Sequence, residues 1–175
     1  IGHYLAHISS VLHDSLTGLP GPPELHQRIT VEQNKASNSD HESALVLISA
    51  LNVETINEKF GREIGDEILE EFAKRIRGNI RSADFLGRYG GSVFALILYK
   101  ADAKETLLTV NRIIKSVTTN PYTAKSLKVQ ASAGIALCTG DPDAQSQLIL
   151  QRGAQALQVA KDTASNDPVI WKANE

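Results

Sequence analysis

The chain has 175 residues, of which 42% are apolar and 22% are charged, and its formal net charge is −2. This is enough apolar material for one domain with a core and too little for two. The near-neutral charge excludes a global footprint for nucleic acid, so an anion site has to be a local cluster of basic residues. The single cysteine, Cys138, excludes a disulfide framework and predicts an ordinary buried thiol in a reducing compartment.

Membrane and targeting signals are missing from the sequence. No apolar run approaches the roughly 18 to 20 residues that cross a bilayer, and no signal segment opens the chain. We therefore expect a domain without direct membrane contact, in the cytoplasm or as the cytoplasmic part of a membrane-bound sensor. The sequence begins at Ile1 and contains no methionine, so we also expect it to be a piece of a longer protein.

The first third of the chain predicts a connecting helix, a loop and a buried strand. Apolar residues at helical spacing in residues 4–12 predict a helix that leads into the domain, so we divide the chain into residues 1–13 and 14–175. A short helix is expected from Glu24, and the polar residues 33–43 predict a mobile surface loop. The continuous apolar run "ALVLISAL" is typical of a central strand that is covered on both faces.

From Val53 the apolar spacing becomes helical, with a break at "FGREIGD" and a stop near Gly78. A β-hairpin is expected in "DFLGRYGGSVFALILYK". The remaining predicted elements are a helix over 103–117, a half-buried strand over 127–138, an Ala-rich helix over 144–163 and a short closing strand at "PVIW". This order predicts an α+β fold, an α/β sandwich in which helices flank a mostly antiparallel sheet of about five strands.

Four motifs, in this order and spacing, resemble the GGDEF or diguanylate cyclase family. "DSLTGLP" is similar to its D-x-L-T-G-L-x-N-R, "INEKFGREIGDEIL" to its I-N-D-x-[FY]-G-H-x-x-G-D-x-x-L, "RYGGSVF" to its R-[YF]-G-G-[DE]-E-F, and "SAGIA" to its S-[IV]-G-I-A. The resemblance covers nearly the whole chain. It implies a nucleotidyl-cyclase-like fold in a bacterial signalling domain that is fused to sensor or output domains. Active members pair as dimers and condense two GTP molecules into cyclic di-GMP with Mg²⁺.

The family's catalytic positions hold residues here that cannot perform its chemistry. Phosphoryl transfer from GTP needs Mg²⁺, which prefers carboxylate oxygens. By the resemblance, the two metal carboxylates fall on Ser49 and Ser92, and the glutamate that activates the attacking hydroxyl falls on Val93. Of the basic pair that grips the triphosphate, Lys161 is kept and the arginine falls on Ser165. The resemblance therefore implies a domain without catalytic residues, metal or cofactor, which is not an enzyme.

Two positions that read the guanine base in the family are retained as Asn57 and Asp66. An amide and a carboxylate suit a guanine edge, so with Lys161 they form a vestigial GTP site that would bind weakly without Mg²⁺. The ordinary alternative is equally simple. Asp66 is a good residue near a helix start, and Asn57 can cap or turn the chain.

The pattern Arg81-x-x-Asp84, with five residues between Asp84 and Gly90, resembles the family's inhibitory site for cyclic di-GMP. A guanidinium forks a phosphate or a guanine edge, and a carboxylate accepts from the guanine N1 and N2 hydrogens. By spacing, Arg112 is the arginine that completes this site in the family, and Arg88 is close enough in sequence to add positive charge. The same pattern could also be an ordinary ion pair at a helix end, worth well under 1 kcal/mol.

The sequence thus favours a catalytically inactive GGDEF domain that acts as a cyclic di-GMP receptor or regulatory module. The expected partners are cyclic di-GMP, weakly GTP, a second copy in a homodimer and fused domains, but not nucleic acid. One alternative is an interaction or dimerisation domain that binds no nucleotide, and another is a GTP-binding regulator of an attached EAL domain. The five histidines predict no metal site, since only His3 and His7 share a helical spacing.

Overall fold

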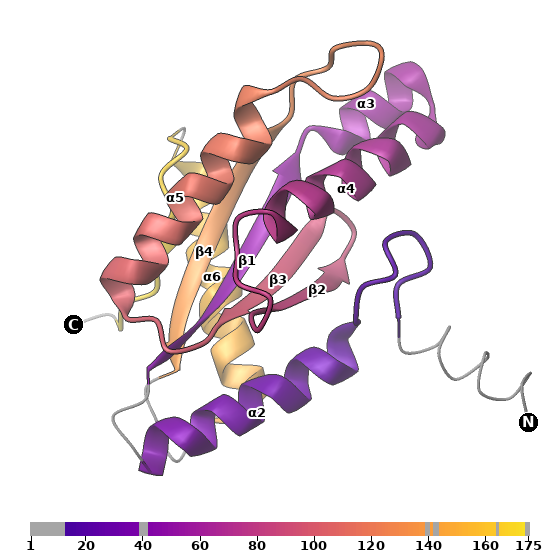
Figure 1. Ribbon diagram of the computed structural model, residues 1–175. Coiled ribbons are helices and arrows are strands. Elements are labelled where there is room, and N and C mark those ends of the chain that lie inside the picture. Colours follow the sequence, from indigo (N-terminus) through magenta and orange to yellow (C-terminus); the bar gives the residue numbers. More distant parts are fainter. Residues whose placement is uncertain (1–12, 39–41, 139–140, 142–143, 164, 174–175) are drawn as a thin grey trace, which may run out of the picture.

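The computed structural model describes residues 13–38, 42–138, 141, 144–163 and 165–173. These residues form one five-stranded sheet with helices on both faces, as Figure 1 shows. The predicted helix over residues 4–12, and His3, His7 and His41, lie outside the described residues.

The sheet has the strand order β2-β3-β1-β4-β5. The central strand β1 (Ser43–Leu51) pairs antiparallel with β3 (Val93–Leu98) and with β4 (Gln130–Cys138). Strand β2 (Phe85–Gly90) continues the antiparallel pattern at one edge, whereas β5 (Val169–Ile170) pairs parallel with β4 at the other. The predicted α+β sandwich with a mostly antiparallel sheet is confirmed.

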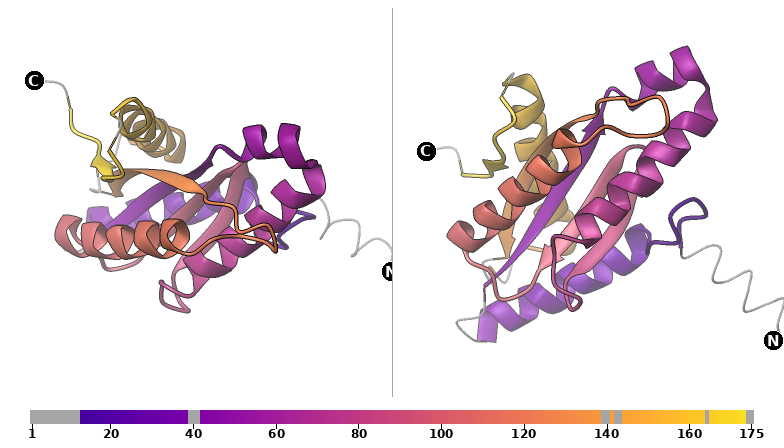
Figure 2. Two further views of the ribbon diagram at one scale, coloured as in Figure 1. Left: turned by 90° about the horizontal axis from the view of Figure 1, so that it is seen from above. Right: turned by 45° about the horizontal axis from the view of Figure 1, so that its top comes forward.

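The two faces of the sheet have separate cores, because alternate residues of β1 point to opposite sides. Helices α4 (Arg62–Arg77) and α5 (Ala103–Thr119) cover the face that carries Val46 and Ile48. Helices α2 (Pro22–Asn38) and α6 (Ser146–Asp162) cover the face that carries Leu45 and Leu47. The views in Figure 2 show this layering, and α3 (Val53–Phe60) leads into α4 through Gly61.

Helix α2 is longer than the sequence predicted, because residues 33–38 continue it instead of forming a loop. The polar residues in this turn have partners from distant parts of the chain. The buried Gln33 donates from Nε2 to the Ala144 carbonyl at 2.9 Å, and the buried Glu32 accepts from the Ser43 hydroxyl at 2.7 Å. The prediction of a loop was wrong because such tertiary contacts hold polar residues in a helix that local pattern does not indicate.

Strand β4 is buried on both faces, not half-buried as predicted. The residues that face α6, Ser132, Gly134 and Ala136, are all small. A Cβ atom on Gly134 would lie 2.2 Å from the Leu157 nitrogen, so only glycine lets α6 pack this closely. Cys138 ends the strand as a buried thiol, as predicted, and burial raises its pKa to about 12.

Within the described ranges, no helix is long and apolar enough to cross a membrane.

Candidate functional site

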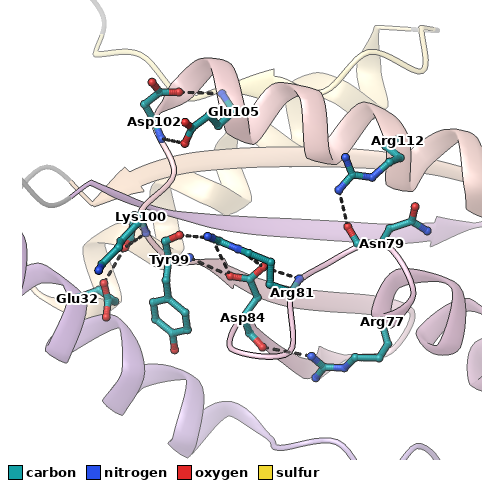
Figure 3. A network of polar contacts seen from close by, with 11 residues as sticks. Glu32, Arg77, Asn79, Arg81, Asp84, Tyr99, Lys100, Asp102, Glu105 and Arg112 are labelled. Atoms are coloured by element: carbon teal, nitrogen blue, oxygen red, sulfur yellow. Dashed lines mark hydrogen bonds and ion pairs between the residues drawn. The ribbon is translucent and has the colours of Figure 1, made fainter.

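A hollow of about 290 Å³ lies between the loop that joins α4 to β2, the end of β3 and one side of α5. It brings together Arg81, Asp84 and Arg112, three residues that sequence spacing had selected. Arg81 and Asp84 belong to the loop, and Arg112 reaches toward the same loop from α5 (Figure 3). The hollow therefore brings the Arg81–Asp84 pair of the loop together with the Arg112 guanidinium of α5.

The Asp84 carboxylate organises the loop. Its side chain is only 3% exposed, and its two oxygens accept four hydrogen bonds. The backbone N–H groups of Arg81 and Tyr99 donate to it at 2.9 and 3.2 Å, and the Arg81 guanidinium donates from Nε and Nη2 at 3.3 and 3.2 Å. Burial of a carboxylate costs free energy unless donors and a positive charge surround it, as they do here. The Arg81–Asp84 pair is therefore a hydrogen-bonded part of the loop and not only an ordinary ion pair at a helix end.

The Arg81 side chain is 59% exposed and lines the hollow. Its Nη2 also donates to the Tyr99 carbonyl, which ties the loop to the end of β3. Among the described residues, no protein acceptor binds its Nη1. The guanidinium is therefore held in place while one of its nitrogens stays free for a ligand.

Arg112 approaches the same loop from the exposed side of α5. Its Nη2 donates to the Asn79 carbonyl at 2.7 Å, and in the part of the chain that the structure describes no carboxylate pairs with it. Glu105, which also lines the hollow, is engaged in a capping box with Asp102 at the start of α5. The Arg112 guanidinium is thus available to bind an anion.

Arg88, the fourth residue predicted for this site, is not brought to the hollow. It lies on β2, 14% exposed, where Nη1 pairs with Asp14 at 3.0 Å and Nε donates to the Gly91 carbonyl at 3.0 Å. The Arg88 guanidinium therefore links the loop that carries Asp14 to the tip of the β2–β3 hairpin. Arg88 lies four residues beyond Asp84 along β2, and because a strand rises about 3.3 Å per residue, this carries it roughly 13 Å away from the turn.

The hairpin end of the sheet carries the other set of predicted positions. Ser49 is 2% exposed and sits across from Val93 on β3, while the Ser92 carbonyl accepts from the Ala50 N–H at 2.9 Å. Serine hydroxyls and valine supply no anionic oxygen for a hard cation. Over the described residues, no group of three His, Cys, Asp or Glu side chains could hold a metal ion.

A scan of protein families matches residues 11–167 to "Diguanylate cyclase, GGDEF domain". The chain belongs to the GGDEF family. It is 30% identical over 169 residues to the bifunctional diguanylate cyclase/cyclic di-GMP phosphodiesterase MucR of Pseudomonas aeruginosa, which covers 95% of this chain and 24% of that protein. It is 31% identical to the response regulator PleD of Caulobacter vibrioides, over 91% of this chain and 36% of PleD. The chain thus spans about a quarter to a third of these relatives.

Solved GGDEF domains have the same fold. The GGDEF domain of YfiN (TpbB) from Pseudomonas aeruginosa superposes with a TM-score of 0.83 at 28% identity, covering 91% of this chain and 94% of that one. The coiled coil and GGDEF domain of DgcB from Caulobacter crescentus, solved in complex with c-di-GMP, superposes with a TM-score of 0.84 at 20% identity, covering 97% and 90%. The nucleotidyl-cyclase-like architecture is therefore confirmed.

In this GGDEF domain, Asn57 and Asp66 lie at the junction of α3 and α4. The Asn57 side chain lies over Gly65, where a Cβ atom would be 1.7 Å from its Oδ1, so glycine makes room for the amide. Oδ1 is buried and has no hydrogen-bond partner within the described residues. Lys161 and Ser165 lie at and beyond the end of α6, both exposed, and Ser165 pairs with Asp167 at 3.0 Å.

The sequence reasoning missed Arg77, the last residue of α4. Its Nη1 donates to the Asp84 carbonyl at 3.2 Å, so it contacts the loop that carries the Arg81–Asp84 pair (Figure 3). The available signal was weak: a cation at a helix end, four residues before Arg81, is a common surface feature.

Proposed function

We propose that this GGDEF domain is catalytically inactive and serves as a receptor for cyclic di-GMP at the hollow of Arg81, Asp84 and Arg112. The observation that carries the proposal is the convergence of these three side chains, two from the α4–β2 loop and one from α5, on one hollow. The curated relatives are named as diguanylate cyclases, one of them also as a cyclic di-GMP phosphodiesterase. Cyclic di-GMP is thus the nucleotide of the signalling to which the relatives belong.

The chemistry of the hollow suits such a ligand. Cyclic di-GMP carries two phosphate charges and two guanine edges, which need cationic forks and hydrogen-bond partners of both kinds. Arg81 offers a free Nη1 on a guanidinium that is already oriented, and Arg112 offers a guanidinium without a carboxylate partner in the described ranges. Exchange of the Asn79 carbonyl for a phosphate oxygen would release Arg112 to the ligand at little cost.

The proposal of inactivity rests on the opposite end of the sheet. Ser49, Ser92 and Val93 place hydroxyl and alkyl groups where the family pattern has carboxylates, and Ser165 stands where it has an arginine. Without anionic ligands the site has no means of holding Mg²⁺ on a triphosphate. We expect no cyclic di-GMP from GTP and Mg²⁺.

In the cell, the domain would act in the cytoplasm as one part of a larger signalling protein. Binding of a dianionic ligand at Arg81 and Arg112 would favour the arrangement of domains in which the ligand also contacts a second copy or a fused output domain. The connecting segment over residues 1–13 would then transmit that choice to or from its neighbours.

Titration calorimetry with cyclic di-GMP tests the receptor function on the 175-residue chain. We expect one saturable heat signal that is lost in Arg81→Ala and kept in Arg62→Ala, which removes an exposed cation at the other end of α4. Unchanged binding in Arg81→Ala would remove the assignment of the pocket. No heat with either cyclic di-GMP or GTP, together with a concentration-dependent mass, would favour a dimerisation domain that binds no nucleotide.

A second candidate function, weak GTP binding in a regulator of an attached domain, is favoured by Asn57. Its buried Oδ1 has no partner among the described residues, and a buried orphan acceptor is expected to find a donor. Titration with GTP, with and without Mg²⁺, tests this candidate. We expect weak binding that Mg²⁺ does not strengthen and that Asn57→Ala removes. An affinity that rises tenfold with Mg²⁺ would contradict it.

A further inference from the structure

The loop between α4 and β2 is surrounded by three guanidinium groups, and each donates to a backbone carbonyl. Arg112 of α5 donates to the Asn79 carbonyl, Arg81 to the Tyr99 carbonyl, and Arg77 of α4 to the Asp84 carbonyl (Figure 3). Only Arg81 and Arg112 line the nucleotide hollow. The third guanidinium, that of Arg77, contacts the loop but does not line this hollow, so its role differs from direct contact with the ligand.

The Arg81–Asp84 turn is closed by its own hydrogen bonds. The Asp84 N–H donates to the Arg81 carbonyl at 3.0 Å, and the Arg81 N–H donates to the Asp84 carboxylate at 2.9 Å. The remaining acceptor of Asp84 is its carbonyl, at the point where the turn enters β2. Arg77 is the donor to this oxygen, at 3.2 Å, and so joins the turn to the end of a packed helix.

Arg77 works from the far side of the turn. Its side chain lines a different hollow, of about 230 Å³, together with Leu16 and Leu19 of the Asp14 loop, Ala73 and Lys74 of α4, and Leu86 of β2. A cation at the last residue of a helix is also favourably placed against the helix dipole, which helps to fix it there. The geometry thus lets Arg77 bind the turn without contact with a ligand in the nucleotide hollow.

We propose that Arg77 is a positioning residue for the cyclic di-GMP pocket. By donating to the Asp84 carbonyl, it holds the Arg81–Asp84 turn in the conformation that presents Arg81 Nη1 to the ligand. The inference rests on the proposed function and adds to it the residue that preorganises the pocket. Since ordering a turn before binding lowers the cost of binding, the loss of Arg77 should weaken affinity without changing which groups touch the ligand.

Three variants separate the hydrogen bond from the charge. Arg77→Ala removes both, while Lys74→Ala removes a cation one turn earlier on the same helix, whose side chain makes no hydrogen bond or ion pair to the turn within the described residues. By calorimetry we expect Arg77→Ala to weaken cyclic di-GMP binding by about three- to tenfold, since a charged hydrogen bond is lost. Lys74→Ala should bind like the wild type, and Arg77→Lys, which can still donate one bond, should recover part of the affinity.

Amide hydrogen exchange of the ligand-free chain supplies a reading that does not depend on cyclic di-GMP. We expect faster exchange of the Arg81 and Asp84 amides in Arg77→Ala, and wild-type exchange in Lys74→Ala. Equal affinity and equal exchange in Arg77→Ala and wild type would overturn the inference. If the wild type binds no cyclic di-GMP, the proposed function fails and this inference fails with it; wild-type binding with an unaffected Arg77→Ala removes only the inference.

Discussion

Strand β2 connects two turns whose chemistry is opposite. The turn before it holds a buried carboxylate that accepts four hydrogen bonds, and the exposed guanidinium of Arg81. The turn after it, at Gly90 and Gly91, is followed by Ser92 and Val93 and faces a buried Ser49. The hairpin nevertheless keeps its shape. Main-chain pairing and the Asp14–Arg88 ion pair maintain this tip, so its backbone conformation does not depend on side chains suited to metal binding.

The largest expected difference between the two turns is in stability. Asp84→Ala should lower the free energy of unfolding by about 2 to 3 kcal/mol, because buried N–H groups of Arg81 and Tyr99 lose their acceptor. It should also abolish binding of cyclic di-GMP. The matched change at the tip, Ser92→Ala, should stay within about 0.5 kcal/mol. Urea denaturation of the two variants measures both, and equal losses would contradict the contrast drawn between the turns.

The next effect is on affinity alone. Arg112→Ala should weaken cyclic di-GMP binding by about tenfold, since one charged hydrogen bond to the ligand is lost, while unfolding changes by less than about 0.5 kcal/mol. Lys115→Ala, an exposed cation one turn further along α5, is the control and should bind as the wild type does. Calorimetry distinguishes them, and a loss in both variants would point to a general field rather than to a pocket.

A smaller effect is expected when carboxylates replace Ser49 and Ser92 at the hairpin tip. Ser49→Asp combined with Ser92→Asp should destabilise the metal-free protein through like-charge repulsion, and Mg²⁺ should then restore about 1 kcal/mol at roughly five times its dissociation constant. The wild type and the single Ser92→Asp variant should show no Mg²⁺-dependent shift of the melting temperature. A Mg²⁺-dependent shift of the melting temperature in the wild type would show that the tip binds metal and would contradict the contrast between the two turns.

The smallest effect concerns the ion pair that supports the tip. Burial alone would raise the pKa of Asp14, but hydrogen bonds from Thr17 and the Arg88 guanidinium bring this pKa below its ordinary value. A depressed carboxyl pKa contributes stability that is complete above the unfolded pKa and is lost as the pH falls through the folded value. The free energy of unfolding should therefore depend less steeply on pH below about pH 4 in Asp14→Asn than in the wild type. An unchanged slope would mean that this pair does not support the tip.

Much of the fold followed from local pattern. The apolar run of β1, the break between α3 and α4 and the hairpin are each written in consecutive residues, and each was confirmed. The length of α2 was not, because Glu32 and Gln33 depend on partners at Ser43 and Ala144. The burial of β4 was missed for a similar reason. Its small residues admit α6, and small residues alone do not say how close a helix will come.

For the site, the sequence by itself determined which groups exist: the missing carboxylates at Ser49, Ser92 and Val93, and the Arg81-x-x-Asp84 pair, since these are matters of residue identity and spacing. Only the tertiary structure decided where they point. In the folded chain, Arg112 lines the hollow, Arg88 pairs with Asp14, and Arg77 donates to the Asp84 carbonyl. The physical reason is that an arginine side chain is long enough to reach acceptors on several other elements. Which acceptor lies within reach is set only when the sheet and helices pack together.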